Sequence, residues 1–171
     1  MTLPGQSGSG RLLARLRDRQ LTLATAESLT GGLVAAAITS VPGASQAFRG
    51  GIVAYATEVK ATVLGVPAQV LTNFGPVAAE TAEAMAIAVQ RLFGADMGIS
   101  TTGVAGPDPV GDSLPGLAYV AASFGGGPVL VRQIQVSGDR REVRQACVAA
   151  ALAAGLAVLE RSLPPGDLTR E

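Results

Sequence analysis

Short apolar runs alternate with longer stretches of helical periodicity along most of the chain. The runs at 21–26 and 50–56 have the length of buried strands, and a helical pattern follows each of them. Strands that alternate with helices and end in a hairpin predict an α/β sandwich with a mixed parallel and antiparallel sheet. We expect helices over 11–20, 33–40, 57–65, 76–93 and 139–161, a turn or short helix from 67, a strand from 97 that runs into a Gly-rich loop, and strands over 21–26, 50–56, 116–124 and 128–136.

The clearest helical pattern covers residues 76–93. Pro76 suits a first helical position, acidic residues follow near the positive end of the helix dipole, and Gly94 is a stop signal. The apolar positions recur at helical spacing, which predicts one buried face. That face comprises Ala82, Met85, Ala86, Val89 and Phe93.

Length and composition indicate one domain. The chain has 171 residues, 48% of them hydrophobic and 15% charged, which is too apolar for a disordered protein. We expect a disordered Gly/Ser-rich segment over 1–10, a single domain over 11–162 and a tail over 163–171. The N-terminus has no signal-peptide pattern, and no uninterrupted apolar stretch is long enough to span a bilayer. We therefore expect a cytoplasmic protein.

Charge and missing residue types narrow the chemistry. Thirteen basic and thirteen acidic side chains give a net charge of zero, which argues against nucleic-acid and membrane partners. The chain has no His, which excludes a Ser-His-Asp triad and imidazole metal sites, and we expect no metal. The lone Cys147 lies in an apolar run and is predicted to be a buried small hydrophobe.

Ser28 and Lys60 are the candidate catalytic pair. Ser28 follows a predicted strand in the segment ESLTGG, where α/β sheets bind ligands, although a Ser here is also a common helix N-cap. Lys60 is the single Lys beside twelve Arg, and it is either a desolvated base or a solvated helix-surface residue. Without His, a Ser nucleophile needs another base, such as Lys. Tyr55 either orients the Lys60 amine or relays a proton through its phenol, or is a half-buried strand aromatic.

Two further segments offer substrate contacts. Thr102 and Gly103 lie where a strand runs into a second Gly-rich loop, which suits a polar substrate, although a plain Gly-Pro turn explains the same residues. Arg140 and Arg144 lie one turn apart near the start of the last predicted helix. They either hold a phosphate or belong to a solvated face paired with acidic neighbours.

Four segments in order give a more specific resemblance. From about Leu23 to Leu159 the chain resembles the C-terminal domain of the CinA family, through TAESLTGGLVAAAITSVPGAS, RGGIVAYATEVKATVLGV, TGVAGP and SGDRREVR. The resemblance implies a three-layer α/β/α sandwich, commonly a homodimer, that hydrolyses nicotinamide mononucleotide to nicotinic acid mononucleotide and ammonia. It implies no metal or organic cofactor.

Carried over position by position, the resemblance assigns the family's catalytic serine, tyrosine and lysine to Ser28, Tyr55 and Lys60. We expect neutral Lys60 to remove the Ser28 proton and the amides of Gly31 and Gly32 to stabilise the oxyanion. The residues expected to bind substrate are Thr30, Gly31, Gly32, Thr102, Gly103, Arg140 and Arg144.

The chain departs from the family pattern at three places. Leu29 stands where members often have Cys, and Thr57 stands where they often have Asn. Residues 108–116 lack the lysine of the family's Gly-rich loop. The changed loop leaves two alternatives open: a catalytically impaired nucleotide-binding protein, or an amidase for a related pyridine amide.

Overall fold

A five-stranded mixed sheet lies at the centre of the fold. The computed structural model describes residues 7–162. Its strands are β1 (Leu23–Glu27), β2 (Phe48–Val53), β3 (Met97–Gly103), β4 (Leu117–Phe124) and β5 (Leu130–Gln135). The order is β2-β1-β3-β4-β5, where β1 is parallel to both neighbours and the pairs β3–β4 and β4–β5 are antiparallel. The predicted mixed sheet and C-terminal hairpin are confirmed.

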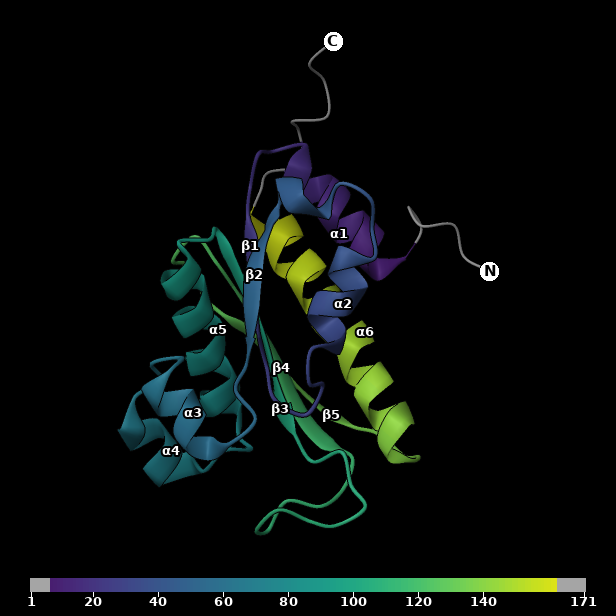
Figure 1. Cartoon of the computed structure of the whole chain (residues 1–171). Coiled ribbons are helices and arrows are strands. Elements are labelled where there is room, and N and C mark those ends of the chain that lie inside the picture. The colour runs from purple at the N-terminus through teal and green to yellow at the C-terminus, as the bar shows by residue number, and fades with distance from the viewer. Residues whose placement is uncertain (1–6, 163–171) are drawn as a thin grey trace.

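Helices cover both faces of the sheet and make three layers (Figure 1). They are α1 (Gly8–Arg17), α2 (Leu33–Thr39), α3 (Thr57–Thr62), α4 (Ala68–Phe74), α5 (Ala79–Phe93) and α6 (Arg140–Ser162), with a 3₁₀ turn at Ala44–Gln46. Helices α1, α2 and α6 cover one face, and α5 covers the other with α3 and α4 beside it. Each face has its own apolar core, since Leu12 packs with Ile99 on one side and Met85 packs with Ala24 on the other.

The first helix begins earlier than predicted. It starts at Gly8 and not at residue 11, because Ser7 Oγ accepts a hydrogen bond from Gly10 N at 3.1 Å and caps the helix. Residues 7–10, which we expected to be disordered, therefore form the cap and first residues of α1. The rest of that expected segment, 1–6, and the expected tail, 163–171, lie outside the described residues.

Helix α5 begins later than predicted. It starts at Ala79, because Ala78 is extended, while Pro76 O accepts the Thr102 hydroxyl at 2.6 Å. The predicted apolar face is buried at Ala82, Met85, Ala86 and Val89, whereas Phe93 is half-buried.

Helix α6 packs along the sheet and along α1. By length and composition alone it is apolar enough to cross a membrane, unlike our expectation that no such stretch exists. Many of its buried residues, including Leu152 and Leu159, belong to the apolar core on that face of the sheet. Cys147 on this helix is fully buried, as predicted, and burial raises the pKa of its thiol to about 11.

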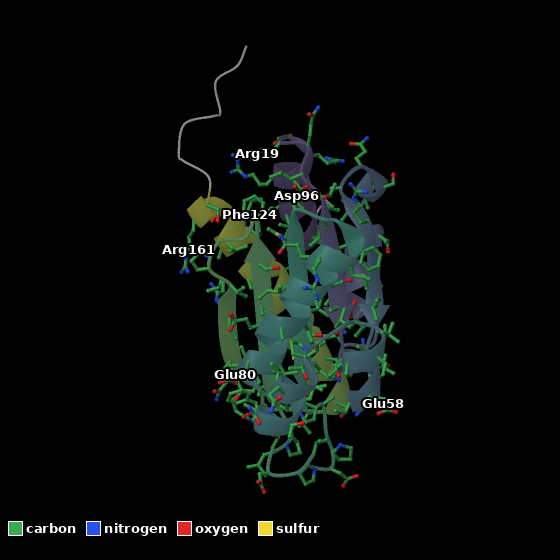
Figure 2. The ribbon with its side chains drawn as sticks, turned by 90° about the vertical axis from the view of Figure 1, so that its left-hand side faces the viewer. Arg19, Glu58, Glu80, Asp96, Phe124 and Arg161 are labelled. Carbon is green, nitrogen blue, oxygen red and sulfur yellow. The ribbon has the colours of Figure 1, made fainter. Side chains whose placement is uncertain are left out.

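The topology gathers three strand ends at one edge. Because β1 is parallel to β2 and β3, the carboxyl ends of all three lie together, where α/β proteins bind ligands. Figure 2 shows Asp96, which precedes β3, at the opposite end of the molecule from Glu58 and Glu80. Residues that follow these three strands are therefore neighbours.

A glycine in β3 sets how closely α5 packs on the sheet. A Cβ at Gly98 would collide with the backbone oxygen of Ala86 and lie 2.9 Å from Gln90 Cβ, both on α5. We expect Gly98→Ala to lower the free energy of unfolding by about 1–3 kcal/mol, measured by urea denaturation. Gly127→Ala is the control, since its Cβ would meet Phe124 O at an ordinary 3.5 Å. Equal loss in the two variants would contradict the packing argument.

Candidate active site

Ser28 lies immediately after β1, where the strand passes into the Gly-rich turn. Its N–H donates to Thr101 O at 3.0 Å, so its backbone continues the pairing of β1 with β3. The helix that follows has Gly32 as its N-cap, with no side-chain hydrogen bond. The N-cap interpretation of Ser28 is therefore wrong, and its hydroxyl has a different partner.

That partner is Lys60. Its Nζ lies 3.1 Å from Ser28 Oγ, 2.8 Å from Ala54 O and 3.3 Å from Tyr55 O. The side chain is 1% exposed, so Lys60 is not a solvated surface residue. Burial lowers the pKa of the Lys60 amine to about 8, and the nearby carboxylate of Glu58 opposes this shift only in part.

The two carbonyls reach Lys60 because β2 ends early. The strand stops at Val53, three residues before the predicted end at 56, and Ala54 N then donates to Glu27 O at 2.8 Å. The chain beyond this point leaves the sheet beside the end of β1 and enters α3, which carries Lys60. Ala54 O and Tyr55 O are thus left to accept hydrogen bonds from the amine.

Three oxygen atoms around the amine suit a neutral base. A neutral amine has two hydrogens and one lone pair, whereas an ammonium has three hydrogens and no lone pair. Two hydrogens satisfy the carbonyls of Ala54 and Tyr55, and the lone pair is then available to the Ser28 hydroxyl proton. The arrangement is therefore able to deprotonate Ser28 when Lys60 is neutral.

Glu27 holds the turn that carries Ser28, and our sequence analysis did not select it. Its carboxylate is 1% exposed and lies beside the start of α2, where the helix dipole favours negative charge. The signal available in the sequence was an acidic residue that ends an apolar strand. Its four hydrogen bonds come from Thr30 Oγ1 (2.7 Å), Gly32 N (3.0 Å), Val34 N (3.0 Å) and Ala35 N (2.8 Å).

Gly31 and Gly32 support the turn and do not line the pocket. Their φ angles are 58° and 96°, which L side chains rarely adopt. Gly31 N donates to Ser28 O and Gly32 N donates to Glu27, so the expected oxyanion role of these two amides is wrong. Thr30 is fully buried, with its hydroxyl on Glu27, and none of the three residues lines the pocket.

A pocket of about 160 Å³ opens at Ser28 and Lys60. Thr102 and Gly103 line it, as predicted, and so does Asp108 from the changed loop. Asp108 was not predicted to line the pocket, because it stands in a loop that departs from the family pattern. Among residues 7–162, no group of three or more His, Cys, Asp or Glu side chains is placed to hold a metal ion.

The phenol of Tyr55 pairs with Arg140 at the pocket. The side chain is 58% exposed, and its hydroxyl accepts a hydrogen bond from Arg140 Nη2 at 2.8 Å. Arg140 Nη1 donates to Gly106 O at 2.8 Å, which places this guanidinium at the pocket wall. The interpretation of Tyr55 as a half-buried strand aromatic is wrong, because its side chain is exposed. Its carbonyl accepts a hydrogen bond from Lys60, while its side chain lines the pocket, and the proton-relay role of its phenol stays a prediction.

Arg144 contacts the serine turn and does not line the pocket. Its Nε donates to Leu29 O at 3.0 Å and its Nη2 donates to Thr30 O at 2.8 Å. Arg140 and Arg144 therefore bind different loops, and a shared phosphate site is not formed. Nor do they pair with acidic neighbours, because Asp139 and Glu142 exchange hydrogen bonds with each other's backbone at the start of α6.

The fold and this site define an α/β sandwich with a buried Ser–Lys pair at the carboxyl ends of three parallel strands. The chain belongs to the CinA C-terminal domain family, whose profile matches residues 6–159. A solved structure of the competence/damage inducible protein CihA from Agrobacterium tumefaciens is 33% identical, with a TM-score of 0.86 over 94% of this chain and 99% of that chain. A CinA superfamily protein from Klebsiella pneumoniae, 28% identical, has a TM-score of 0.87 over 94% of this chain and 99% of that one.

Sequence relatives agree with this assignment. A CinA-like protein from Frankia casuarinae is 49% identical over 143 residues, which cover 84% of this chain and 33% of the relative. A putative competence-damage inducible protein from Desulforamulus reducens is 46% identical over 80% of this chain and 33% of its own length. The chain thus spans about a third of the length of these relatives.

The buried amine gives a stability signature. Folding lowers the pKa of Lys60 from 10.5 to about 8, so between these values the unfolded chain binds more protons than the folded one. The contribution of Lys60 to the free energy of unfolding therefore rises with pH from about 8 to 10.5. We expect the free energy of unfolding of wild type, measured by urea denaturation, to increase relative to that of Lys60→Met as the pH rises across this range. A difference that does not vary with pH would contradict a lowered pKa.

Proposed function

We propose that the protein is a nicotinamide-nucleotide amidohydrolase that converts nicotinamide mononucleotide to nicotinic acid mononucleotide and ammonia. The observation that carries the proposal is the 3.1 Å contact between Ser28 Oγ and the buried Lys60 amine. A Ser–Lys pair is a known alternative to Ser-His-Asp in acyl transfer. Family membership supports the substrate class, because the CinA resemblance implies this amide.

The reaction uses the pair twice. Neutral Lys60 accepts the Ser28 proton as Oγ bonds to the carboxamide carbon, and the carbonyl oxygen becomes an oxyanion. Collapse of this intermediate breaks the C–N bond, and the Lys60 ammonium returns the proton to the leaving amine, which departs as ammonia. Water then attacks the Ser28 ester, with Lys60 again taking the proton and returning it to Ser28 as the carboxylic acid leaves.

Substrate contacts come from other residues that line the pocket. Thr102 Oγ1 donates to Pro76 O, so it faces a substrate amide only as an acceptor. Arg140 is the lining guanidinium, and its exposed position suits an anionic group at the pocket mouth. We further propose that the protein acts in the cytoplasm as a homodimer, with no nucleic-acid or membrane partner, in keeping with its zero net charge.

The first test is ammonia release from nicotinamide mononucleotide. We expect turnover by wild type and a loss of about 10³-fold or more in Ser28→Ala, which lacks the nucleophile. Lys60→Arg should lose a similar factor, because guanidinium keeps the charge and does not act as a base at neutral pH. Binding of the nucleotide by wild type without any ammonia release would overturn the proposal and favour a nucleotide-binding protein. Release from another pyridine amide alone would favour the related amidase.

The pH dependence of turnover tests the role of Lys60. Because the free amine is the active form, kcat/KM should rise with pH and level off above a pKa near 8, well below the ordinary 10.5 of lysine. The measurement is initial-rate kinetics from pH 6 to 10 with a constant ionic strength. A rate that continues to rise up to pH 10, or no rise at all, would exclude Lys60 as the base.

Arg140 is expected to contribute binding energy. Arg140→Ala removes the guanidinium that lines the pocket, so KM for nicotinamide mononucleotide should rise about tenfold or more with a smaller effect on kcat. Tyr55→Phe is the matched comparison, since it removes the hydroxyl that accepts from Arg140 and keeps the guanidinium. An unchanged KM in Arg140→Ala would show that this residue does not contact substrate.

A further inference from the structure

Two backbone N–H groups beside the nucleophile have no acceptor. Ser28, Leu29, Thr30 and Gly31 form a turn closed by the hydrogen bond from Gly31 N to Ser28 O at 3.0 Å. The N–H groups of the two central residues take no part in such a turn. Within the described part of the chain, Leu29 N and Thr30 N donate to no protein atom.

Burial makes these free amides unusual. Leu29 is 3% exposed and Thr30 is fully buried, and buried backbone N–H groups almost always have a partner. The neighbouring amides are all occupied: Ser28 N by Thr101 O, Gly31 N by Ser28 O and Gly32 N by Glu27. Among the described residues of this turn, the N–H groups without an acceptor are therefore those of Leu29 and Thr30, and of these two residues only Leu29 lines the pocket.

Arg144 fixes the same two residues from their carbonyl side. Its Nε holds Leu29 O at 3.0 Å and its Nη2 holds Thr30 O at 2.8 Å. These two hydrogen bonds hold the turn in one conformation and so fix the direction of the Leu29 N–H. Leu29 lines the pocket beside Ser28, whereas Arg144 does not.

We propose that the amide of Leu29, which lines the pocket beside Ser28, is the oxyanion donor, and that Arg144 is the positioning residue that holds its turn in place. The inference rests on the proposed acyl-enzyme reaction at Ser28. Charge develops on the carboxamide oxygen only after Ser28 attacks, so donors fixed in advance lower the barrier without strengthening substrate binding. Arg144 therefore acts through the backbone, whereas Arg140 contacts the substrate directly.

The first experiment separates positioning from binding. We expect Arg144→Gln and Arg144→Lys to lower kcat about 10²-fold, with KM changed less than threefold and the pKa of the rate profile unaltered. Lys keeps the charge but does not provide the paired donors, so the two variants should behave alike. Arg141→Gln, an exposed change on the same helix, is the control and should match wild type. A raised KM with unchanged kcat in the Arg144 variants would overturn the proposal.

The second experiment removes one donor directly. Leu29→Pro deletes the Leu29 N–H at a turn position that Pro tolerates, and Leu29→Ala removes a comparable amount of buried side chain while keeping the N–H. We expect Leu29→Pro to lose at least tenfold more kcat than Leu29→Ala. Circular dichroism and thermal unfolding verify that both variants fold. Equal kcat in the two folded variants would exclude the Leu29 amide.

A third measurement needs no turnover. 3-Pyridylboronic acid adds to a serine Oγ as a tetrahedral anion, and its affinity therefore depends on the oxyanion donors. We expect its Kd to rise about tenfold or more in Arg144→Lys, Arg144→Gln and Leu29→Pro, and to stay unchanged in Arg141→Gln. If wild type binds the boronate and the variants bind it more weakly, but wild type releases no ammonia, the proposed substrate is wrong and the oxyanion hole is supported. If affinity is the same in all variants, the oxyanion hole is wrong whatever the substrate.

Discussion

The site depends on a lysine amine held out of water between two carbonyl oxygens and one hydroxyl. An ammonium in that place loses most of its hydration, and three neutral acceptors replace it only in part. The lowered pKa of Lys60 follows from this imbalance. The same burial places the amine against Ser28. The loss of hydration that lowers its pKa therefore goes together with the close contact that a base needs.

Glu27 fixes the turn that presents Ser28 to the Lys60 amine. A carboxylate at the end of β1 gathers three amides and one hydroxyl from the residues that follow, and fixes the path from strand to helix. Its oxygens lie on the α2 side of the sheet, whereas Ala24 and Ala26 on the same strand pack toward α5. Successive side chains of β1 point to opposite faces of the sheet, so one short strand contributes to the apolar core on one face and to the site on the other.

The sequence predicted the sandwich, its mixed sheet and the Ser28–Lys60 pair, because each leaves a local signal: strand and helix periods, a serine after a strand, and one lysine among arginines. It did not predict which N–H groups are occupied. The assignment of the oxyanion to Gly31 and Gly32 failed because the carboxylate of Glu27 reaches Gly32 from five residues away. Likewise, equal spacing on one helix suggested that Arg140 and Arg144 act together, although their targets lie on separate loops. Helical spacing places two residues on one face of a helix, but it does not determine which groups their long side chains reach.

Arg140 and Arg144 on α6 have two separate places in the site. One turn of helix separates a guanidinium at the pocket wall from one that grips the serine turn at two carbonyls. Under the proposed function, the first distinguishes substrates by their anionic groups, while the second serves every substrate that Ser28 attacks. Under the proposed function, a change in the loop beside Arg140, such as Asp108, alters what is bound and leaves the bond-breaking machinery intact. Divergence of substrate among chains with this fold is thus expected at the pocket mouth, and loss of catalysis at the turn around Ser28 and its supports.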